Sequence, residues 1–136
     1  MIKYYIYTDG GARGNPGPAA IGVVIKNEAG ENVCEISKYI GEKTNNQAEY
    51  TAVIEALQKT KELKADELNF FLDSELVVKQ LNREYKVKDQ DLAMMFLKIH
   101  NLSMYFKKIY YNHVPREKNV EADKLVNVAL DKEEKK

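Results

Sequence analysis

Residues 2–20 read IKYYIYTDGGARGNPGPAA. The first part, residues 2–9, is rich in β-branched and aromatic residues, which is typical of a strand. That strand ends in one acid, Asp9, and four glycines and two prolines follow within the next nine residues. A plain turn needs only one or two glycines, so this composition indicates a loop whose backbone a bulky group approaches closely.

The composition is that of one compact globular domain. The chain has 136 residues, of which 44% are hydrophobic and 31% are charged. Lys and Arg together number 21, as do Asp and Glu, so the formal net charge is zero. Because bulk charge offers no attraction for nucleic acid, any binding of nucleic acid would depend on a local patch. We predict one domain over residues 1–131 and a charged, flexible tail over residues 132–136.

Cysteine content and the absence of targeting patterns indicate a cytoplasmic protein without membrane contact. The only cysteine, Cys34, excludes an intramolecular disulfide and a multi-cysteine zinc site. It lies in an apolar, strand-like run, which favours a buried structural thiol over a nucleophile. The first residues lack the pattern of a signal peptide, and no apolar run approaches membrane-spanning length.

Hydrophobic periodicity predicts nine elements of an α/β fold, including the strand over residues 2–9. Strands are predicted over residues 2–9, 19–27, 31–41, 67–73 and 108–114. Helices are predicted over residues 44–63, 74–82, 89–106 and 117–132. The order βββαβααβα indicates a five-stranded mixed sheet whose first three strands are antiparallel and whose faces carry helices.

Four acids lie at the ends or starts of predicted elements. Asp9 ends the first strand and Asp73 ends the fourth, while Glu49 and Asp123 lie early in the first and last helices. If the two strands are parallel neighbours, all four carboxylates can meet at one sheet edge. They would repel one another unless divalent cations were bound, and ligands that are all oxygen favour Mg²⁺ or Mn²⁺ over zinc. Any single one of the 21 acids is, by itself, more often solvated surface.

Four stretches together resemble the ribonuclease H type 1 family over nearly the whole chain. They are YTDGGARGNPGPAAIG (7–22), TNNQAEY (44–50), DSELVVKQL (73–81) and HVPREKNVEADKLVN (113–127). The resemblance implies the ribonuclease H-like fold and an enzyme, an endonuclease that hydrolyses the RNA strand of RNA/DNA hybrids. It also implies two Mg²⁺ ions, with Mn²⁺ as a possible substitute, and products with a 5′ phosphate and a 3′ hydroxyl.

The resemblance assigns both catalysis and metal binding to Asp9, Glu49, Asp73 and Asp123. It implies that Asp9 bridges both ions. Asp123 would help to hold the ion that activates the attacking water. Glu49 and Asp73 would hold the ion at the leaving 3′ oxygen.

The resemblance also gives the glycine-rich stretch a role in nucleic-acid binding. Its backbone, at residues 10–14, would approach the 2′-hydroxyls that line the shallow minor groove of the hybrid. The predicted nucleic-acid contacts are Gly10, Gly11, Arg13, Asn15, Thr44, Asn45 and Asn46. Two other interpretations stay open: a hairpin loop that touches nothing, and asparagines that merely follow a helix cap.

The sequence departs from the family in places that concern affinity. Glu42 stands where the family often has an arginine in its phosphate pocket. Residues 82–91 are too short for the family's basic protrusion, so we predict a compact form with weaker grip on the hybrid. His113 is more typical of a packed or half-exposed histidine than of a catalytic one, and Asn119 is predicted to be a polar neighbour of the site.

The partner that the resemblance implies is an RNA/DNA hybrid, and we expect a monomer. Two alternatives remain from the sequence. One is a nucleic-acid-binding module of this fold with weak activity, although all four carboxylates are present. The other is the same chemistry on RNA/RNA duplexes or RNA–DNA junctions, because fold and site do not determine the substrate.

Overall fold

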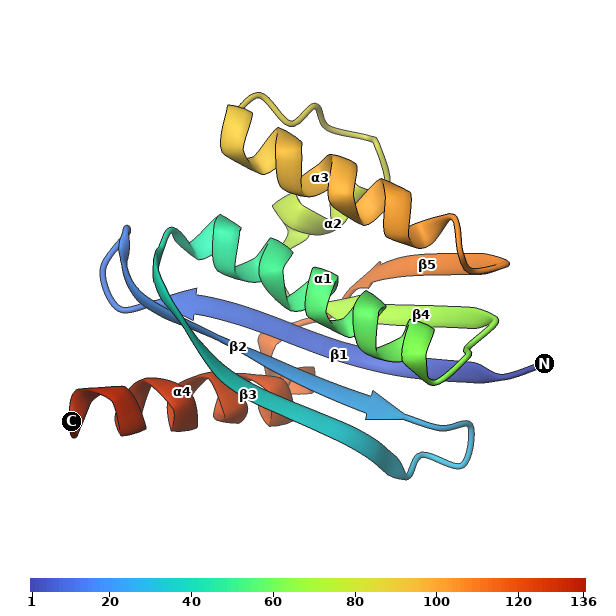
Figure 1. Ribbon diagram of the computed structural model, residues 1–136, viewed down its shortest axis with the longest axis horizontal. Coiled ribbons are helices and arrows are strands. Elements are labelled where there is room, and N and C mark those ends of the chain that lie inside the picture. Colours follow the sequence, from blue (N-terminus) through green and yellow to red (C-terminus); the bar gives the residue numbers. More distant parts are fainter.

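A computed structural model describes residues 1–136 as a five-stranded sheet between two layers of helices (Figure 1). The strands are β1 Lys3–Ala12, β2 Gly17–Lys26, β3 Asn32–Lys43, β4 Glu67–Leu72 and β5 Lys108–His113. The helices are α1 Asn45–Glu62, α2 Glu75–Leu81, α3 Gln90–Ser103 and α4 Val120–Glu134, with a 3₁₀ turn, η1, at Arg116–Lys118. The predicted order of strands and helices is confirmed.

The central strand β1 is paired differently along its two edges. The strands lie in the order β3-β2-β1-β4-β5, with β1, β2 and β3 antiparallel and with β4 and β5 parallel to β1. Pairing with β2 continues to Ala12, but pairing with β4 ends at Tyr7, opposite Phe71. From Thr8 onward, the edge of β1 that faces β4 therefore lacks a strand partner.

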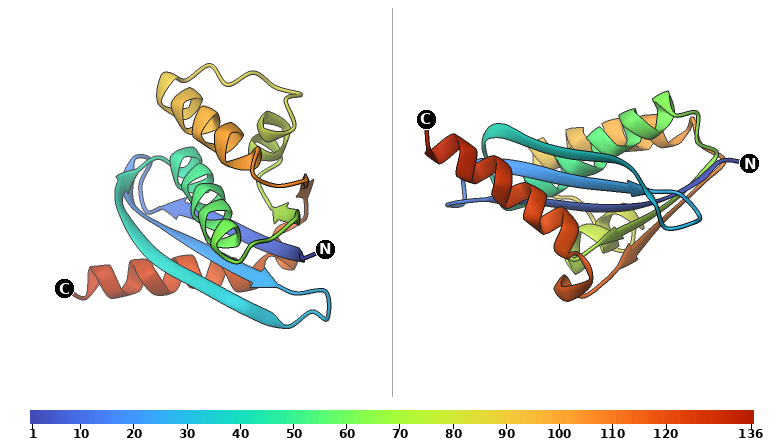
Figure 2. Two further views of the ribbon diagram at one scale, coloured as in Figure 1. Left: turned by 45° about the vertical axis from the view of Figure 1, so that its right-hand side comes forward. Right: turned by 90° about the horizontal axis from the view of Figure 1, so that it is seen from below.

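The two faces of the sheet carry unequal layers. Helices α1, α2 and α3 cover one face, and α4 lies against the other (Figure 2). The larger core, under α1, contains fully buried residues such as Ile6, Leu57 and Phe70. The α4 layer has a much smaller apolar cluster: Ala20, Val126, Ala129 and Leu130. Cys34 is half-buried and packs against the larger core, in keeping with a structural thiol.

The start of α1 is set by a capping box. The Thr44 hydroxyl accepts a hydrogen bond from the Gln47 amide (3.1 Å), and the Gln47 side chain accepts one from the Thr44 amide (2.9 Å). This reciprocal pair satisfies backbone donors that the helix itself leaves free. Because the helix begins at Asn45, Glu49 lies in its second turn, directed at β1.

The prediction of a loop directly after Asp9 is wrong. Gly10, Gly11 and Ala12 continue β1 and pair with β2. Glycine is a poor strand former, which hid this extension from a propensity-based prediction. A close approach does occur, but the groups that approach belong to the protein. A methyl group on Gly10 would overlap the backbone of Ala48 in α1.

The last helix also differs from its prediction at both ends. It begins at Val120, after η1, and continues through Glu134. Most of residues 132–136 is therefore helical, and the flexibility of that tail stays a prediction. The connection between α2 and α3 contains no further helix, which confirms the compact form without a protrusion.

Candidate active site

Side chains complete the unpaired edge of β1. The Gly10 amide donates to Glu49 Oε1 (2.5 Å), and the Ala12 amide donates to Asn45 Oδ1 (2.9 Å). The Thr8 carbonyl accepts from Asn119 Nδ2 (2.9 Å). Backbone groups in such a position must find partners, and here α1 and the segment before α4 supply them. The same bonds hold Glu49 beside Asp9.

Three of the four predicted acids meet at this edge. Asp9, Glu49 and Asp73 each place one carboxylate oxygen so that the three oxygens lie within 4.8 Å of one another. Asp9 and Glu49 are buried, and Asp73, directly after β4, is half-buried. The second oxygen of Glu49, Oε2, is also buried and has no hydrogen-bond partner.

Asp123 reaches the neighbourhood of Asp9 from the other face of the sheet. Gly22 lies opposite Asp9 in the β1–β2 register, and a methyl group there would overlap the backbone of Ala122 in α4. This close approach brings Asp123 near enough for its carboxyl to raise the pKa of Asp9. Asp123 is nevertheless outside the group of three whose oxygens lie closest together.

The surroundings of the acids favour their protonated forms when no cation is present. Burial raises the pKa of Asp9 from its ordinary 3.8 to about 7. A hydrogen bond from Glu49 acts in the opposite direction, while the charge of Asp73 raises the pKa further. Burial, followed by the charge of Asp9, raises the pKa of Glu49 well above its ordinary value. A nearby cation would favour the ionised forms and so oppose both shifts.

The donor set fits a hard divalent cation. All nearby ligand atoms are carboxylate oxygens, the set that Mg²⁺ and Mn²⁺ prefer over softer metals. The unpartnered Oε2 of Glu49 is the kind of buried polar atom that is otherwise costly to leave unbonded. Asp9, Glu49 and Asp73 can therefore hold a divalent ion.

Most of the predicted nucleic-acid residues lie around the start of α1. Gly10 and Gly11 lie in β1, and Asn15 lies in the turn to β2, where its Oδ1 accepts from the Asn45 amide (3.0 Å). Asn15 and Asn45 thus fix the turn against α1. The interpretation that the asparagines merely follow a helix cap did not include this contact. Asn46 is half-buried in the same first turn of α1.

Arg13 is held by α4. Its guanidinium contacts Glu134 (2.7 Å), Asp131 (2.9 Å) and Asn127 (3.2 Å), all on the second half of that helix. The long separation in sequence hid these partners from sequence reasoning. In this arrangement Arg13 is bound to the protein's own acids.

A polar hollow of about 420 Å³ lies beside the start of α1. It is lined mainly by Asn15, Thr44, Asn45, Asn46, Gln47 and Asp89. Asp89 was not predicted as a residue of this surface, because its place in the sequence indicates only a helix N-cap. Its side chain does cap α3. No lysine or arginine lines the hollow, which agrees with the unusual Glu42 noted in the sequence.

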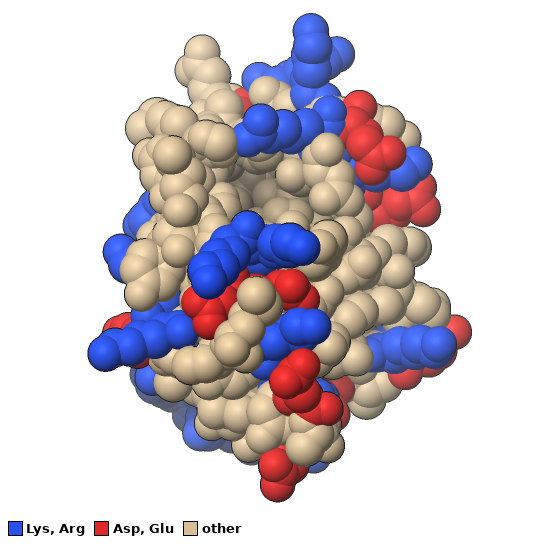
Figure 3. All heavy atoms as spheres, turned by 90° about the vertical axis from the view of Figure 1, so that its right-hand side faces the viewer, with Lys and Arg blue, Asp and Glu red and all other residues tan.

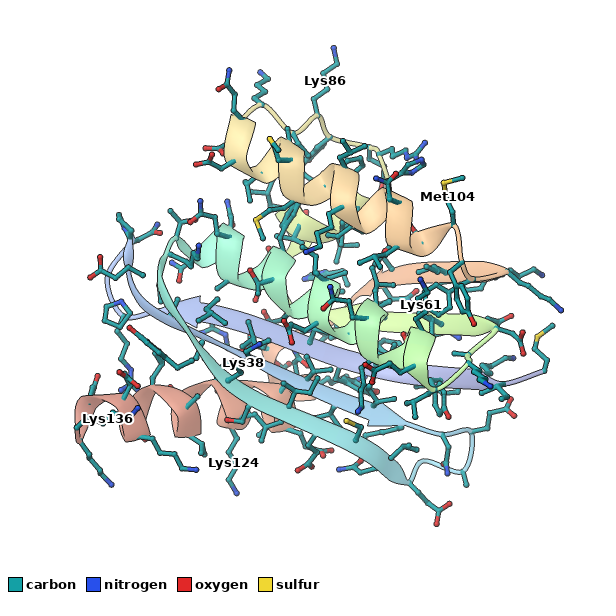
Figure 4. All side chains as sticks on the ribbon, viewed as in Figure 1. Lys38, Lys61, Lys86, Met104, Lys124 and Lys136 are labelled. Atoms are coloured by element: carbon teal, nitrogen blue, oxygen red, sulfur yellow. The ribbon has the colours of Figure 1, made fainter.

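Charges of both signs are mixed elsewhere on the surface. Figure 3 shows lysine and arginine interspersed with acidic side chains on the face that it presents. Lys86, in the connection between α2 and α3, is exposed and projects away from the sheet (Figure 4). His113 ends β5 and is exposed, so the expectation that it is packed is wrong.

Comparison with known proteins identifies the family. The sequence matches the family described as Reverse transcriptase-like over residues 7–129. It is 33% identical over 151 aligned positions to Ribonuclease H of Ruthia magnifica, covering 97% of this chain and 98% of that protein. The chain belongs to the ribonuclease H family. None of its helices is both long and apolar enough to cross a membrane.

Other ribonuclease H relatives show the same similarity. A bifunctional protein of Mycobacterium tuberculosis is 42% identical over 131 residues; the alignment covers 96% of this chain but only 36% of the relative's length. The crystal structure of LC11-RNase H1 in complex with RNA/DNA hybrid superimposes with a TM-score of 0.91 at 49% identity, covering 95% of this chain and 97% of the other. The predicted ribonuclease H-like fold is confirmed.

Proposed function

We propose that this protein is an endonuclease that hydrolyses the RNA strand of RNA/DNA hybrids with the help of divalent cations. The observation that carries this proposal is the group of three carboxylates, buried or half-buried, at the unpaired edge of β1. The similarity to a relative solved with a bound RNA/DNA hybrid supports the substrate class. Its products would carry a 5′ phosphate and a 3′ hydroxyl.

We assign the cation ligands to Asp9, Glu49, Asp73 and Asp123, with two Mg²⁺ ions as the natural cofactor and Mn²⁺ as a substitute. Bound there, the ions would supply charge stabilisation for the attacking and leaving oxygens of the phosphoryl displacement. Helix α1 carries Glu49 on one face of the sheet, and α4 carries Asp123 on the other. Both acids lie close enough to Asp9, in the strand between these helices, to affect its pKa. This position suits a ligand shared by both ions.

The protein's own contribution is to hold these acids rigidly and to exclude water from part of their surroundings. The Gly10 amide fixes one oxygen of Glu49 and leaves Oε2 free. Burial of Asp9 keeps its carboxyl in a weakly solvated place, where electrostatic interactions with a cation are stronger than in water. The site is thus organised before the substrate binds.

We assign recognition of the hybrid to the backbone of Gly10 and Gly11, the Arg13 side chain and the polar residues around the start of α1, which are Asn15, Thr44, Asn45 and Asn46. Asn15, Thr44, Asn45 and Asn46 line the polar hollow, and the Gly10 amide contacts Glu49. Hydroxyl groups at the 2′ position both donate and accept hydrogen bonds, so amides of this kind can distinguish RNA from DNA. Because the hollow contains Asp89 and no cationic side chain, we expect a weak grip on the DNA-strand phosphates.

The test is cleavage of a labelled RNA/DNA hybrid beside RNA/RNA and DNA/DNA duplexes of the same sequence, with Mg²⁺, with Mn²⁺ and with a chelator. We expect cutting of the RNA strand in the hybrid only, and only with a metal. Asp9→Asn should abolish this cutting. Its matched control is Glu62→Gln, which makes the same change of charge at an exposed position at the end of α1.

Three results would count against parts of this proposal. Cleavage that survives the chelator would exclude the metal assignment. Equal cleavage of RNA/RNA duplexes would widen the substrate class. Binding of the hybrid without cleavage by either metal would favour a nucleic-acid-binding module of this fold.

A further inference from the structure

Asn119 is a buried amide that contacts the acid cluster. It lies between η1 and α4 with only 1% of its surface exposed. Its Nδ2 donates to the Thr8 carbonyl of β1 (2.9 Å) and to Asp73 Oδ2 after β4 (3.2 Å). One side chain therefore joins two neighbouring strands at the point where their own pairing has ended.

The orientation of this amide follows from its neighbours. Both contacted atoms, the Thr8 carbonyl oxygen and Asp73 Oδ2, accept hydrogen bonds and have no hydrogen to donate when Asp73 is ionised. Only the NH₂ group of Asn119 can face them, one hydrogen to each. The Oδ1 atom is left buried without a partner, a cost that the two bonds to the site must offset.

The side chain of Asn119 makes these contacts in place of a helix-capping hydrogen bond. It is the N-cap residue of α4, and asparagine at that position normally uses its side chain to accept from an amide of the first turn. No such cap bond forms here. The backbone carbonyl of Asn119 still accepts from the Asp123 amide (3.1 Å), so the residue also fixes the turn that carries the fourth acid.

We propose that Asn119 is a positioning residue that orients Asp73, and through its backbone Asp123, for binding of the divalent cation. The inference rests on the proposed function. Groups that hydrogen-bond to a metal ligand fix its orientation, and their removal typically weakens metal binding by roughly 10- to 100-fold. The hydrogen bond from Asn119 holds one oxygen of Asp73 and leaves the other free for a cation.

The experiment measures Mn²⁺ binding by calorimetry in the absence of nucleic acid, on wild-type protein and on Asn119→Leu, which keeps the size of the side chain but removes the donor. We expect the variant to bind Mn²⁺ at least about 10-fold more weakly than the wild type. In cleavage assays at a fixed Mn²⁺ concentration, kcat should fall while KM for the hybrid stays the same. Excess Mn²⁺ should restore part of the lost kcat.

Two control variants separate positioning from general damage. Thr60→Val removes another fully buried hydrogen bond, to the Ala56 carbonyl at the far end of α1, and should lower Tm without changing Mn²⁺ affinity. Asn119→Ala, which creates no steric demand, provides the same test if the leucine variant does not fold. Loss of Mn²⁺ affinity in folded Asn119→Ala would support the inference equally.

The outcomes distinguish this inference from the proposed function. Wild-type affinity in folded Asn119→Leu or Asn119→Ala would overturn the positioning role, provided that Asp9→Asn weakens Mn²⁺ binding as the proposed site requires. If Asp9→Asn binds Mn²⁺ as wild type does, the cation site lies elsewhere. Both the proposed function and the inference about Asn119 would then be wrong.

Discussion

The two halves of β1 differ in what satisfies their backbone. Residues Lys3–Tyr7 pair with β4 on one side, and from Tyr5 onward they also pair with β2 on the other. Residues Thr8–Ala12 keep β2, but their other edge is completed by the side chains of Asn45, Glu49 and Asn119. The first half is ordinary sheet, and the second half is a sheet edge that the protein has filled with functional groups.

This difference shows how one strand can serve both stability and chemistry. In the first half, Ile6 and its neighbours are fully buried in the larger core. In the second half, the departure of β4 opens room for Asp9, Glu49 and Asp73 to converge. Ligands commonly bind beyond the carboxyl ends of parallel strands for this reason. Substitutions in the first half should therefore lower mainly the stability of the protein, and substitutions of the acids in the second half should lower mainly its activity.

The largest effect on activity is expected from Asp9→Asn in the second half. Removing this carboxylate deletes a proposed ligand to the cations, and stabilisation worth several kcal/mol would be lost from the transition state. Cleavage of the hybrid should fall by roughly 1,000-fold or more, while the protein stays folded. Steady-state rates and circular dichroism on the same sample measure both. Activity close to wild type would show that Asp9 is not a ligand.

The matched change in the first half is Ile6→Ala. Loss of a large side chain from the core leaves a cavity and should cost about 2–5 kcal/mol of unfolding free energy. The activity of each molecule that remains folded should stay close to that of wild type. Urea titration combined with an active-site count tests this. A large loss of kcat in fully folded Ile6→Ala would mean that the two halves are not separable.

Gly10→Ala should sharpen the comparison further, since Gly10 is where α1 approaches β1. The added methyl group would overlap the backbone of Ala48 and push Glu49 away from Asp9. We expect a loss of about 1–3 kcal/mol in stability, together with weaker Mn²⁺ binding. Gly11→Ala is the matched control for stability, because its methyl group would make only an ordinary contact of 3.7 Å with Val126. Equal stability losses in both variants would contradict this explanation.

The same contrast explains what the sequence could predict. The order of elements followed from periodicity, and the helix predicted over residues 44–63 agrees with α1 to within one residue at each end. The extension of β1 through Gly10 to Ala12 was missed because glycine has a low strand propensity. Glycine is required at Gly10 and Gly22 because the backbones of α1 and α4 approach these positions closely. Such long-range contacts leave only the glycines themselves as a trace in the sequence.

The acids were predicted more successfully than the groups that hold them. Asp9, Glu49 and Asp73 could be placed at one edge because each follows from an element boundary and from resemblance to the family. The Arg13 partners on α4 could not, because nothing local in the sequence links positions more than a hundred residues apart. Asn119 was expected near the site, but its bond to Asp73 required the structure.

The stability of the metal-free protein should depend on pH through the second half of β1. The pKa of Asp9 is about 7 in the folded protein and 3.8 ordinarily, so the unfolded chain releases this proton first as pH rises. Stability should therefore fall between about pH 4 and pH 7, by at most roughly 4 kcal/mol for Asp9 alone. Glu49 acts in the same direction.

Urea midpoints across this pH range, with a chelator and with saturating Mg²⁺, measure the effect. Mg²⁺ should restore stability mainly at the upper end of the range, where the acids are ionised and can bind it. Asp9→Asn should reduce the pH dependence. A metal-free protein that becomes more stable from pH 4 to pH 7 would contradict the burial of these acids.

The smallest effect is expected at the turn that follows β1. Arg13 must leave Asp131 and Glu134 before it can contact a phosphate. Exposed ion pairs contribute about 0.2–1 kcal/mol each, so Glu134→Gln, which removes one of the two, should tighten hybrid binding by about fivefold at most. Binding assays at low and high salt measure this, with the difference shrinking at high salt. Weaker binding would show instead that α4 positions Arg13 for the hybrid.

The central claim is that the unpaired half of β1 organises a cation site, and a titration of ¹⁵N-labelled protein with Mg²⁺, followed by NMR, tests it most directly. The account predicts that chemical-shift changes are concentrated at the backbone of Asp9, Gly10, Glu49, Asp73 and Asn119, with Lys3–Tyr7 nearly unaffected. The absence of shifts at Gly10 and Glu49, or larger shifts at a distant cluster of acids, would contradict it.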